Sequence, residues 1–150
     1  MKVSAVFVMG AVSIACLSAC LAGAWPARAQ DTGPSPLAGT TWRLSELSGE
    51  PVVAAAGAKS PYLLLQAGGD RVQGFGGCNS FSGSYELKEG GRIRFFGVAA
   101  TMMACPDMEI ESQLFRVLET ADNYALTDRG FSLHRARMAP LARFEATPAP

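Results

Sequence analysis

Polar and apolar residues alternate with a period of two over much of the chain after residue 40. In residues 41–47, for example, Trp42 and Leu44 fall on one side and Arg43 and Ser45 on the other. Because successive side chains of a strand point to opposite faces, this pattern predicts a half-buried β-strand. Further alternating or apolar runs, separated by turns rich in glycine, predict strands at residues 62–66, 71–75, 83–88, 92–95, 124–126, 131–134 and 141–145.

The apolar spacing becomes helical between residues 106 and 121. Pro106 suits a first helical position, and Asp107 and Glu111 add negative charge where the helix dipole favours it. Glu111 belongs to the polar face of this predicted helix. The opposite face carries a single apolar stripe, formed by Ile110, Leu114, Val117, Leu118 and Ala121.

Seven or eight short strands, with one amphipathic helix between the fifth and the sixth, predict a mainly β fold. A barrel-like antiparallel sheet, with the helix packed on it or plugging it, leaves no strand edge exposed. In a filled barrel we expect Trp42, Leu64, Phe75, Phe95 and the helix stripe in the interior. A ligand-binding barrel would instead keep an open apolar cavity.

Residues 1–29 are predicted to be a signal peptide. Lys2 precedes a long apolar run, and Ala27 and Ala29 provide the small residues that signal peptidase requires, so cleavage is expected after Ala29. An alternative is that Leu17-Ser18-Ala19-Cys20, which resembles a lipobox, directs acylation of Cys20. The protein would then be an outer-membrane lipoprotein anchored at Cys20. A permanent membrane anchor is less favoured, because glycine and alanine dilute the run and a cleavage site follows it.

Both processing routes place the protein outside the cytoplasm, in the periplasm or secreted. We expect residues 30–36 to be a linker, residues 37–146 to be one domain, and residues 147–150 to be a disordered tail. The processed chain loses Lys2 and Arg28 and keeps a slight excess of acidic residues. No basic cluster remains, so neither nucleic acid nor an anionic membrane surface is an expected partner. After processing we predict no membrane span and a monomer.

Four cysteines are present, and Cys16 and Cys20 lie in the predicted signal segment. The two that remain, Cys78 and Cys105, are expected to form a disulfide, because an even pair in an oxidising compartment is most simply oxidised. Closing a loop of this length contributes about 3–4 kcal/mol in the chain-entropy model. We therefore interpret this pair as structural.

Several segments together resemble the META domain, the family of the heat-shock-associated HslJ protein. They are Leu37-Ala38-Gly39-Thr40-Thr41-Trp42-Arg43-Leu44, Gly74-Phe75-Gly76-Gly77-Cys78-Asn79, Phe81-Ser82-Gly83-Ser84-Tyr85 and Thr101-Met102-Met103-Ala104-Cys105. The resemblance covers about residues 37–146. It implies a small envelope domain, often a lipoprotein, with a barrel-like sheet and a helix. It implies no catalytic activity and links the chain loosely to envelope stress.

Within these motifs Gly77, Asn79, Thr101, Met102 and Met103 have no assigned role. Asn79 is expected to bridge backbone groups in the irregular segment around Cys78, since its amide both donates and accepts hydrogen bonds.

A soft-metal site is the sharpest alternative for the sulfur-rich segment. Met102, Met103, Cys105 and Met108, with Cys78, offer donors of the kind that select Cu(I). Methionine is, however, a common core residue, and oxidation of the cysteines would remove the thiolates. We therefore predict neither a metal nor another cofactor.

No catalytic constellation stands out. His134, the single histidine, is expected at the surface, and no second histidine supports a zinc or relay site. Asp107 and Glu111 stand one helical turn apart and could share a proton or a cation, but the helix dipole explains both. The expected function is that of a non-enzymatic, stress-related structural or protein-interaction module. The alternative is a lipocalin-like binder of a small apolar ligand or a lysozyme inhibitor.

Overall fold

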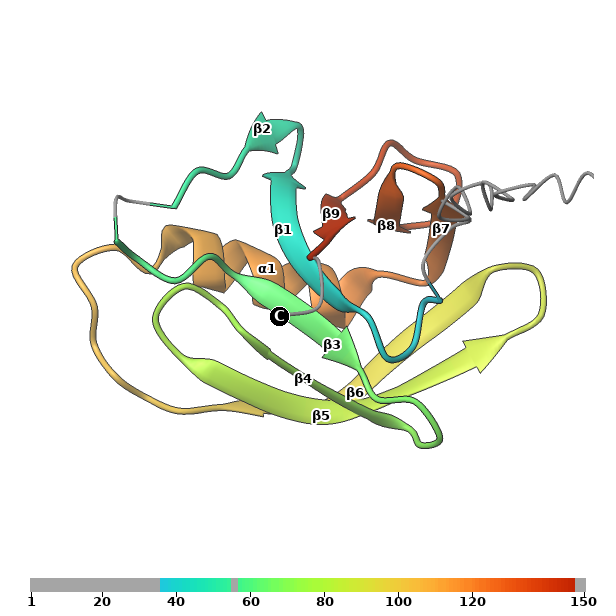
Figure 1. Ribbon diagram of the computed structural model, residues 1–150, viewed down its shortest axis with the longest axis horizontal. Coiled ribbons are helices and arrows are strands. Elements are labelled where there is room, and N and C mark those ends of the chain that lie inside the picture. The colour runs from blue at the N-terminus through green and yellow to red at the C-terminus, as the bar shows by residue number, and fades with distance from the viewer. Residues whose placement is uncertain (1–35, 55–56, 148–150) are drawn as a thin grey trace, which may run out of the picture. The chain divides into compact units, whose positions relative to one another are not determined.

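The computed structural model describes residues 36–54 and 57–147 (Figure 1). The predicted signal peptide, both processing sites, most of the linker and most of the tail lie outside these residues. The described part contains one helix, α1 (Glu109–Thr120). Its strands are β1 (Thr41–Leu47), β2 (Glu50–Pro51), β3 (Tyr62–Leu65), β4 (Arg71–Phe75), β5 (Ser80–Lys88), β6 (Arg92–Ala100), β7 (Asn123–Thr127), β8 (Gly130–His134) and β9 (Ala142–Ala146). None of the described helical residues belongs to a helix long and apolar enough to span a membrane.

Eight of the strands form a closed antiparallel barrel in the order β1-β3-β4-β5-β6-β7-β8-β9, and β9 pairs back onto β1. The predicted fold class is therefore confirmed. Strand β2 pairs only with the end of β1, through the turn at Ser48 and Gly49, which both have positive φ. Because this short strand was not predicted, α1 follows the sixth strand of the chain, although it follows the fifth strand of the barrel.

The number of paired residues differs widely between neighbouring strands of the barrel. Strands β6 and β7 pair only at Arg92 and Asn123, whereas β5 and β6 form a long hairpin with a register shift between Ser82 and Ser84. Helix α1 connects β6 to β7 and crosses behind β1 and β3 in Figure 1, in contact with β6 and β1. The helix thus connects the two neighbouring barrel strands that share the fewest residue pairs.

Strands β5 and β6 are longer than the sequence predicts. Strand β5 begins at Ser80 instead of Gly83, and β6 continues to Ala100 instead of ending at Phe95. The added residues are mostly serine, glycine and alanine, whose small side chains give no clear apolar alternation. Main-chain pairing with β4 and within the hairpin extends these strands nevertheless.

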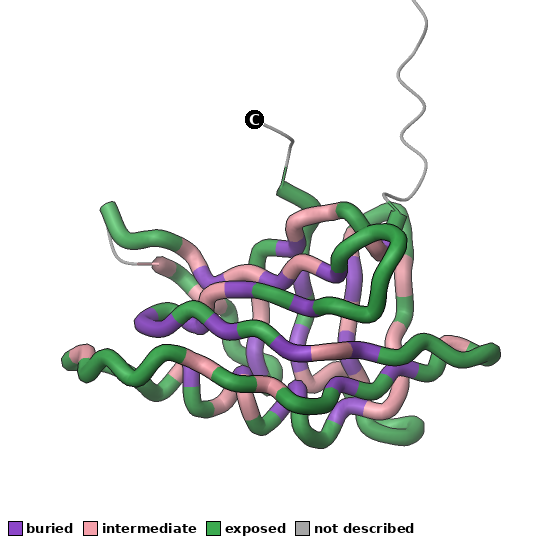
Figure 2. The backbone as a smooth tube through the Cα atoms, turned by 90° about the horizontal axis from the view of Figure 1, so that it is seen from below, coloured by how far each residue is buried: buried purple, intermediate pink, exposed green. Residues whose placement is uncertain are grey.

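One core fills the barrel and continues under the helix (Figure 2). Trp42 lies against Phe131 with ring centroids 5.5 Å apart, and its indole N–H donates to the carbonyl oxygen of Leu37 at 2.9 Å. The largest fully buried apolar side chains are Trp42, Phe131, Phe144, Leu44, Leu63, Leu65, Leu114, Leu118, Leu133 and Val72. The interior is packed with side chains.

The prediction that Leu64 and Phe75 lie in the barrel interior is wrong. Trp42 and Phe95 are buried as predicted, but Leu64 and Phe75 are only partly buried, and Leu63 and Leu65 point inward. The run from Tyr62 to Leu65 is apolar at every position, so its sequence does not show which alternate residues face the core.

The helix stripe is confirmed, with Leu114, Val117, Leu118 and Ala121 buried and Ile110 at its partly buried margin. The helix begins at Glu109, however, and not at Pro106. The carboxylate of Asp107 accepts a hydrogen bond from the Glu109 amide at 3.1 Å, which ends the preceding connection and satisfies a free amide of the first turn.

The tight packing between strands around Gly74 can be tested by substitution. A Cβ at this position would lie 2.5 Å from Cζ of Phe81 and closer still to the carbonyl oxygen of Tyr62. We expect Gly74→Ala to lower the free energy of unfolding by about 1–3 kcal/mol, because the neighbouring strand must move. Gly69→Ala is the matched control, since no atom lies within 4 Å of its Cβ. Equal urea midpoints for the two variants would contradict this account.

Candidate functional site

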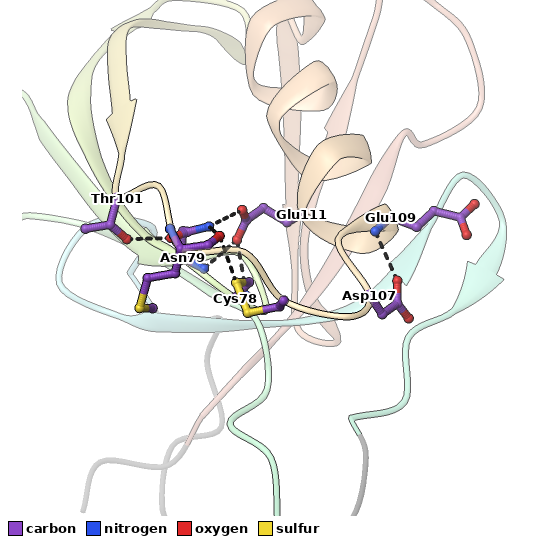
Figure 3. Close-up of a disulfide and its surroundings, with 8 residues drawn as sticks. Cys78, Asn79, Thr101, Asp107, Glu109 and Glu111 are labelled. Carbon is purple, nitrogen blue, oxygen red and sulfur yellow. Dashed lines mark hydrogen bonds between the residues drawn. A yellow bond between two sulfur atoms is a disulfide. The ribbon is translucent and has the colours of Figure 1, made fainter.

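The motif residues gather where the β4–β5 connection meets the longer β6–α1 connection near the start of the helix (Figure 3). Cys78 lies between β4 and β5, and Cys105 lies between β6 and α1. The two form a disulfide with their Cα atoms 6.0 Å apart, as the sequence predicts. It joins chain segments that are 27 residues apart in sequence.

Asn79 is the centre of a buried hydrogen-bond network. Its side-chain oxygen accepts hydrogen bonds from the Thr101 hydroxyl at 2.8 Å and from the Met103 amide at 2.7 Å. Its side-chain amide donates to the carbonyl oxygen of Met103 at 3.1 Å and to Glu111 at 2.8 Å. Asn79 is 1% exposed and thus uses the full hydrogen-bonding capacity of its amide.

The carboxylate of Glu111 accepts the remaining donors of this segment. Its Oε2 atom accepts the backbone amides of Asn79 at 2.6 Å and Cys78 at 3.2 Å, and its Oε1 atom accepts the Asn79 side chain. Glu111 is 3% exposed, and none of the salt bridges among the described residues includes it. Hydrogen bonds from amides therefore replace the water that this carboxylate loses on burial.

The two glycines before Cys78 make this contact possible for different reasons. A Cβ at Gly76 would lie 2.7 Å from Cγ of Glu111, so only glycine leaves room for the carboxylate. A Cβ at Gly77 would make only an ordinary contact with Pro61 at 3.8 Å, but the φ of Gly77 is +123°, a conformation that other residues avoid. The turn is completed by the Gly76 amide, which donates to the carbonyl oxygen of Asn79 at 2.8 Å.

The prediction for Glu111 needs correction. Its place on the polar face predicted a position opposite the buried stripe, and Asp107 was a candidate partner one turn away. In the structure Asp107 binds the Glu109 amide, while Glu111 turns inward to Cys78 and Asn79. The β4–β5 connection, residues 76–79, supplies amide donors that the helical pattern alone does not reveal.

Met102 and Met103 do not enter the network through their side chains, which are both exposed. Met103 contributes only its backbone amide and carbonyl. The alternative soft-metal site loses its thiolates, because Cys78 and Cys105 are joined to each other. In residues 36–54 and 57–147, no cluster of three or more His, Cys, Asp or Glu side chains is placed to hold a metal ion.

His134 differs from its predicted surface position. It is partly buried, and its Nε2 atom lies 2.9 Å from the Ser132 hydroxyl oxygen. Its Nδ1 atom lies 3.4 Å from the carbonyl oxygen of Met138 in the following loop. The loop after β8 therefore contacts the imidazole, which strand alternation does not predict.

The fold and site define a class: a small, closed β-barrel with one inserted helix, in which a disulfide and a buried Asn–Glu network join the β4–β5 connection to the segment that leads into the helix. The family model of the META domain matches residues 35–148. The chain belongs to the META domain family.

Two solved structures are similar to this chain. One is the NMR structure of a protein from Burkholderia xenovorans, with 28% identity and a TM-score of 0.61, covering 75% of this chain and 85% of that chain. The other is an NMR structure with 21% identity and a TM-score of 0.57, covering 71% of this chain and 87% of its own, and it supports the fold alone. A comparison with curated proteins finds no match.

The contribution of Glu111 to stability can be measured against that of another acidic residue on α1. We expect Glu111→Ala to lower the free energy of unfolding by about 2–4 kcal/mol, because the Cys78 and Asn79 amides stay buried without acceptors. Glu119→Ala removes an exposed carboxylate from the same helix and should change stability by less than about 0.5 kcal/mol. Urea unfolding measures both. A loss for Glu111→Ala no larger than that for Glu119→Ala would refute the role of the network.

The disulfide and the Asn79 network hold the same connection by separate means. In Cys78→Ala/Cys105→Ala we expect a loss of about 3–4 kcal/mol of stability. The Met103 amide should still be protected from hydrogen exchange, because Asn79 accepts its hydrogen bond without help from the disulfide. Asn79→Ala with the disulfide intact should show the opposite pattern, with a fast-exchanging Met103 amide. Loss of protection in the cysteine variant would show that the network depends on the disulfide.

Proposed function

We propose that this META-domain protein is an exported, non-enzymatic protein of the cell envelope that acts as a stress-related structural or protein-interaction module. The observation that carries the proposal is the filled interior together with the fully paired buried polar groups. No buried side-chain nitrogen or oxygen of the described residues lacks a hydrogen-bond partner. The surface is therefore the part of this barrel that is available for function.

The disulfide supports export. Disulfides persist in oxidising compartments and are rare in the cytosol. Cys78 and Cys105 are paired in a well-packed position, with Cys78 buried and its amide bound to Glu111. This arrangement suits a constitutive structural bond in the periplasm or outside the cell.

The barrel interior argues against a lipocalin-like role. A small apolar ligand needs an apolar cavity of a few hundred Å³. Here Trp42, Leu63 and Phe131 occupy that space. Surface hollows of about 280 and 510 Å³ are present, but they are open to solvent and lined in part by polar or charged side chains such as Arg94, Gln73 and Arg143.

The exposed apolar side chains favour contact with a protein partner. Val53 lies in the connection after β2, Phe96 on β6, and Met102 in the connection before α1, and all three are exposed. Apolar side chains of this size are typical of the buried centre of protein–protein interfaces, where aromatic residues and methionine are enriched.

Export and processing are tested first. The native protein should fractionate with the periplasm, contain no free thiol, and begin at Gln30 by intact-mass analysis. A diacylglyceryl group on Cys20 would instead establish the lipoprotein route. Recovery from the cytoplasm with two reactive thiols would overturn the proposal.

The interaction role is tested in cells. A photo-crosslinking residue at exposed Phe96 or Met102 should trap one recurrent envelope protein, and the same residue at buried Leu133 should trap none. Deletion of the gene should impair growth under envelope stress. Stoichiometric binding of an apolar fluorophore by the purified protein, without any crosslinked partner, would favour the small-ligand alternative and contradict this one.

A further inference from the structure

All four methionines of the described residues are exposed. Met102 is 98% exposed, Met138 63%, Met103 58% and Met108 36%. Methionine is ordinarily a buried residue that fills gaps in cores. The core of this barrel instead uses leucine, valine, isoleucine and aromatic residues. The placement of the methionines therefore has no explanation in packing.

Three of these methionines lie in the connection between β6 and α1, residues 101–108. This connection is held by groups other than the methionine side chains. Cys105 is bonded to Cys78, and the backbone of Met103 is bound to Asn79 through its amide and its carbonyl. A chemical change at the sulfur of Met102 or Met103 consequently breaks none of the contacts that position the connection.

Other oxidisable groups in the described part of the chain are less accessible. Cys78 and Cys105 are already joined in the disulfide and present no thiol. The indole of Trp42 is buried in the core. An oxidant arriving from solvent therefore meets the thioether sulfurs first, and Met102 is the most exposed of them.

We propose that Met102 and Met103 form a surface site that consumes peroxide-class oxidants while the barrel stays folded. In each reaction the thioether sulfur attacks one oxygen of hydrogen peroxide. A sulfur–oxygen bond forms, the oxygen–oxygen bond breaks, and the second oxygen leaves as water after proton transfer. The sulfur loses two electrons, the peroxide gains them, and the product is methionine sulfoxide.

The product changes the surface more than the fold. A sulfoxide is polar and chiral, and in a core it would disrupt packing, but here both side chains point to solvent. Methionine sulfoxide is also reducible by the two classes of methionine sulfoxide reductase, so the site can be regenerated. This role is independent of any protein partner, and the purified protein alone can test it.

The experiment uses the processed, disulfide-intact protein and hydrogen peroxide. Peptide mapping by mass spectrometry over time should show oxidation of Met102 first, several-fold faster than Met108. After full conversion of Met102 and Met103 the Tm should change by less than about 3 °C, as for other surface changes. Treatment with both sulfoxide reductases should restore the original mass.

Matched variants make the result specific. Met102→Leu/Met103→Leu should retain the Tm but lose the fastest phase of peroxide consumption. Met138→Leu, which removes an exposed methionine from another loop, should keep that phase. The proposal is overturned if the Tm falls in step with oxidation of Met102, if Met108 reacts first, or if the double variant consumes peroxide as fast as the parent. None of these outcomes bears on crosslinking to an envelope protein.

Discussion

The buried carboxylate of Glu111 accepts two successive backbone amides from the β4–β5 connection, and the arrangement of this connection and of the segment before α1 depends on this contact. The Cys78 and Asn79 amides have no strand partner at this point, and the carboxylate satisfies them at 3.2 and 2.6 Å. In return, these two amides and the Asn79 side-chain amide stabilise the buried carboxylate of Glu111, which would be costly to bury without hydrogen bonds. Asn79 is thereby fixed, and through it Thr101 and Met103 are held in place.

This contact also connects the barrel to its helix. Strands β6 and β7 share one residue pair, so the sheet by itself closes weakly beside the helix. Helix α1, which connects these two strands, buries Leu114 and Leu118 in the core, while Glu111 and the disulfide attach its first turns to the β4–β5 connection. Apolar burial holds the helix against the barrel, and the directional hydrogen bonds of Glu111 fix the position of its first turns.

The resulting domain has a rigid interior and a sulfur-rich exposed segment. The buried side-chain nitrogen and oxygen atoms of the described residues are all paired, so the network acts as a structural element. The residues of the two cysteine motifs therefore divide into two groups. Asn79 and Thr101 hold the backbone, whereas the side chains of Met102 and Met103 face solvent, where partners and oxidants can reach them.

The sequence by itself determined the barrel class, the helix stripe and the disulfide, because these follow from alternation, helical spacing and an even cysteine pair. It did not determine which of three consecutive leucines face the core, since Leu63, Leu64 and Leu65 are equally apolar. Nor did it predict that Glu111 is buried. The helix dipole alone explains an acidic residue in the first turns of a helix, so the sequence pattern calls for no further partner. Only the tertiary structure brings Gly76 and the Cys78 and Asn79 amides to that carboxylate, since they come from a loop more than 30 residues away in sequence. Burial of Glu111 is a property of that distant loop, which local patterns do not describe.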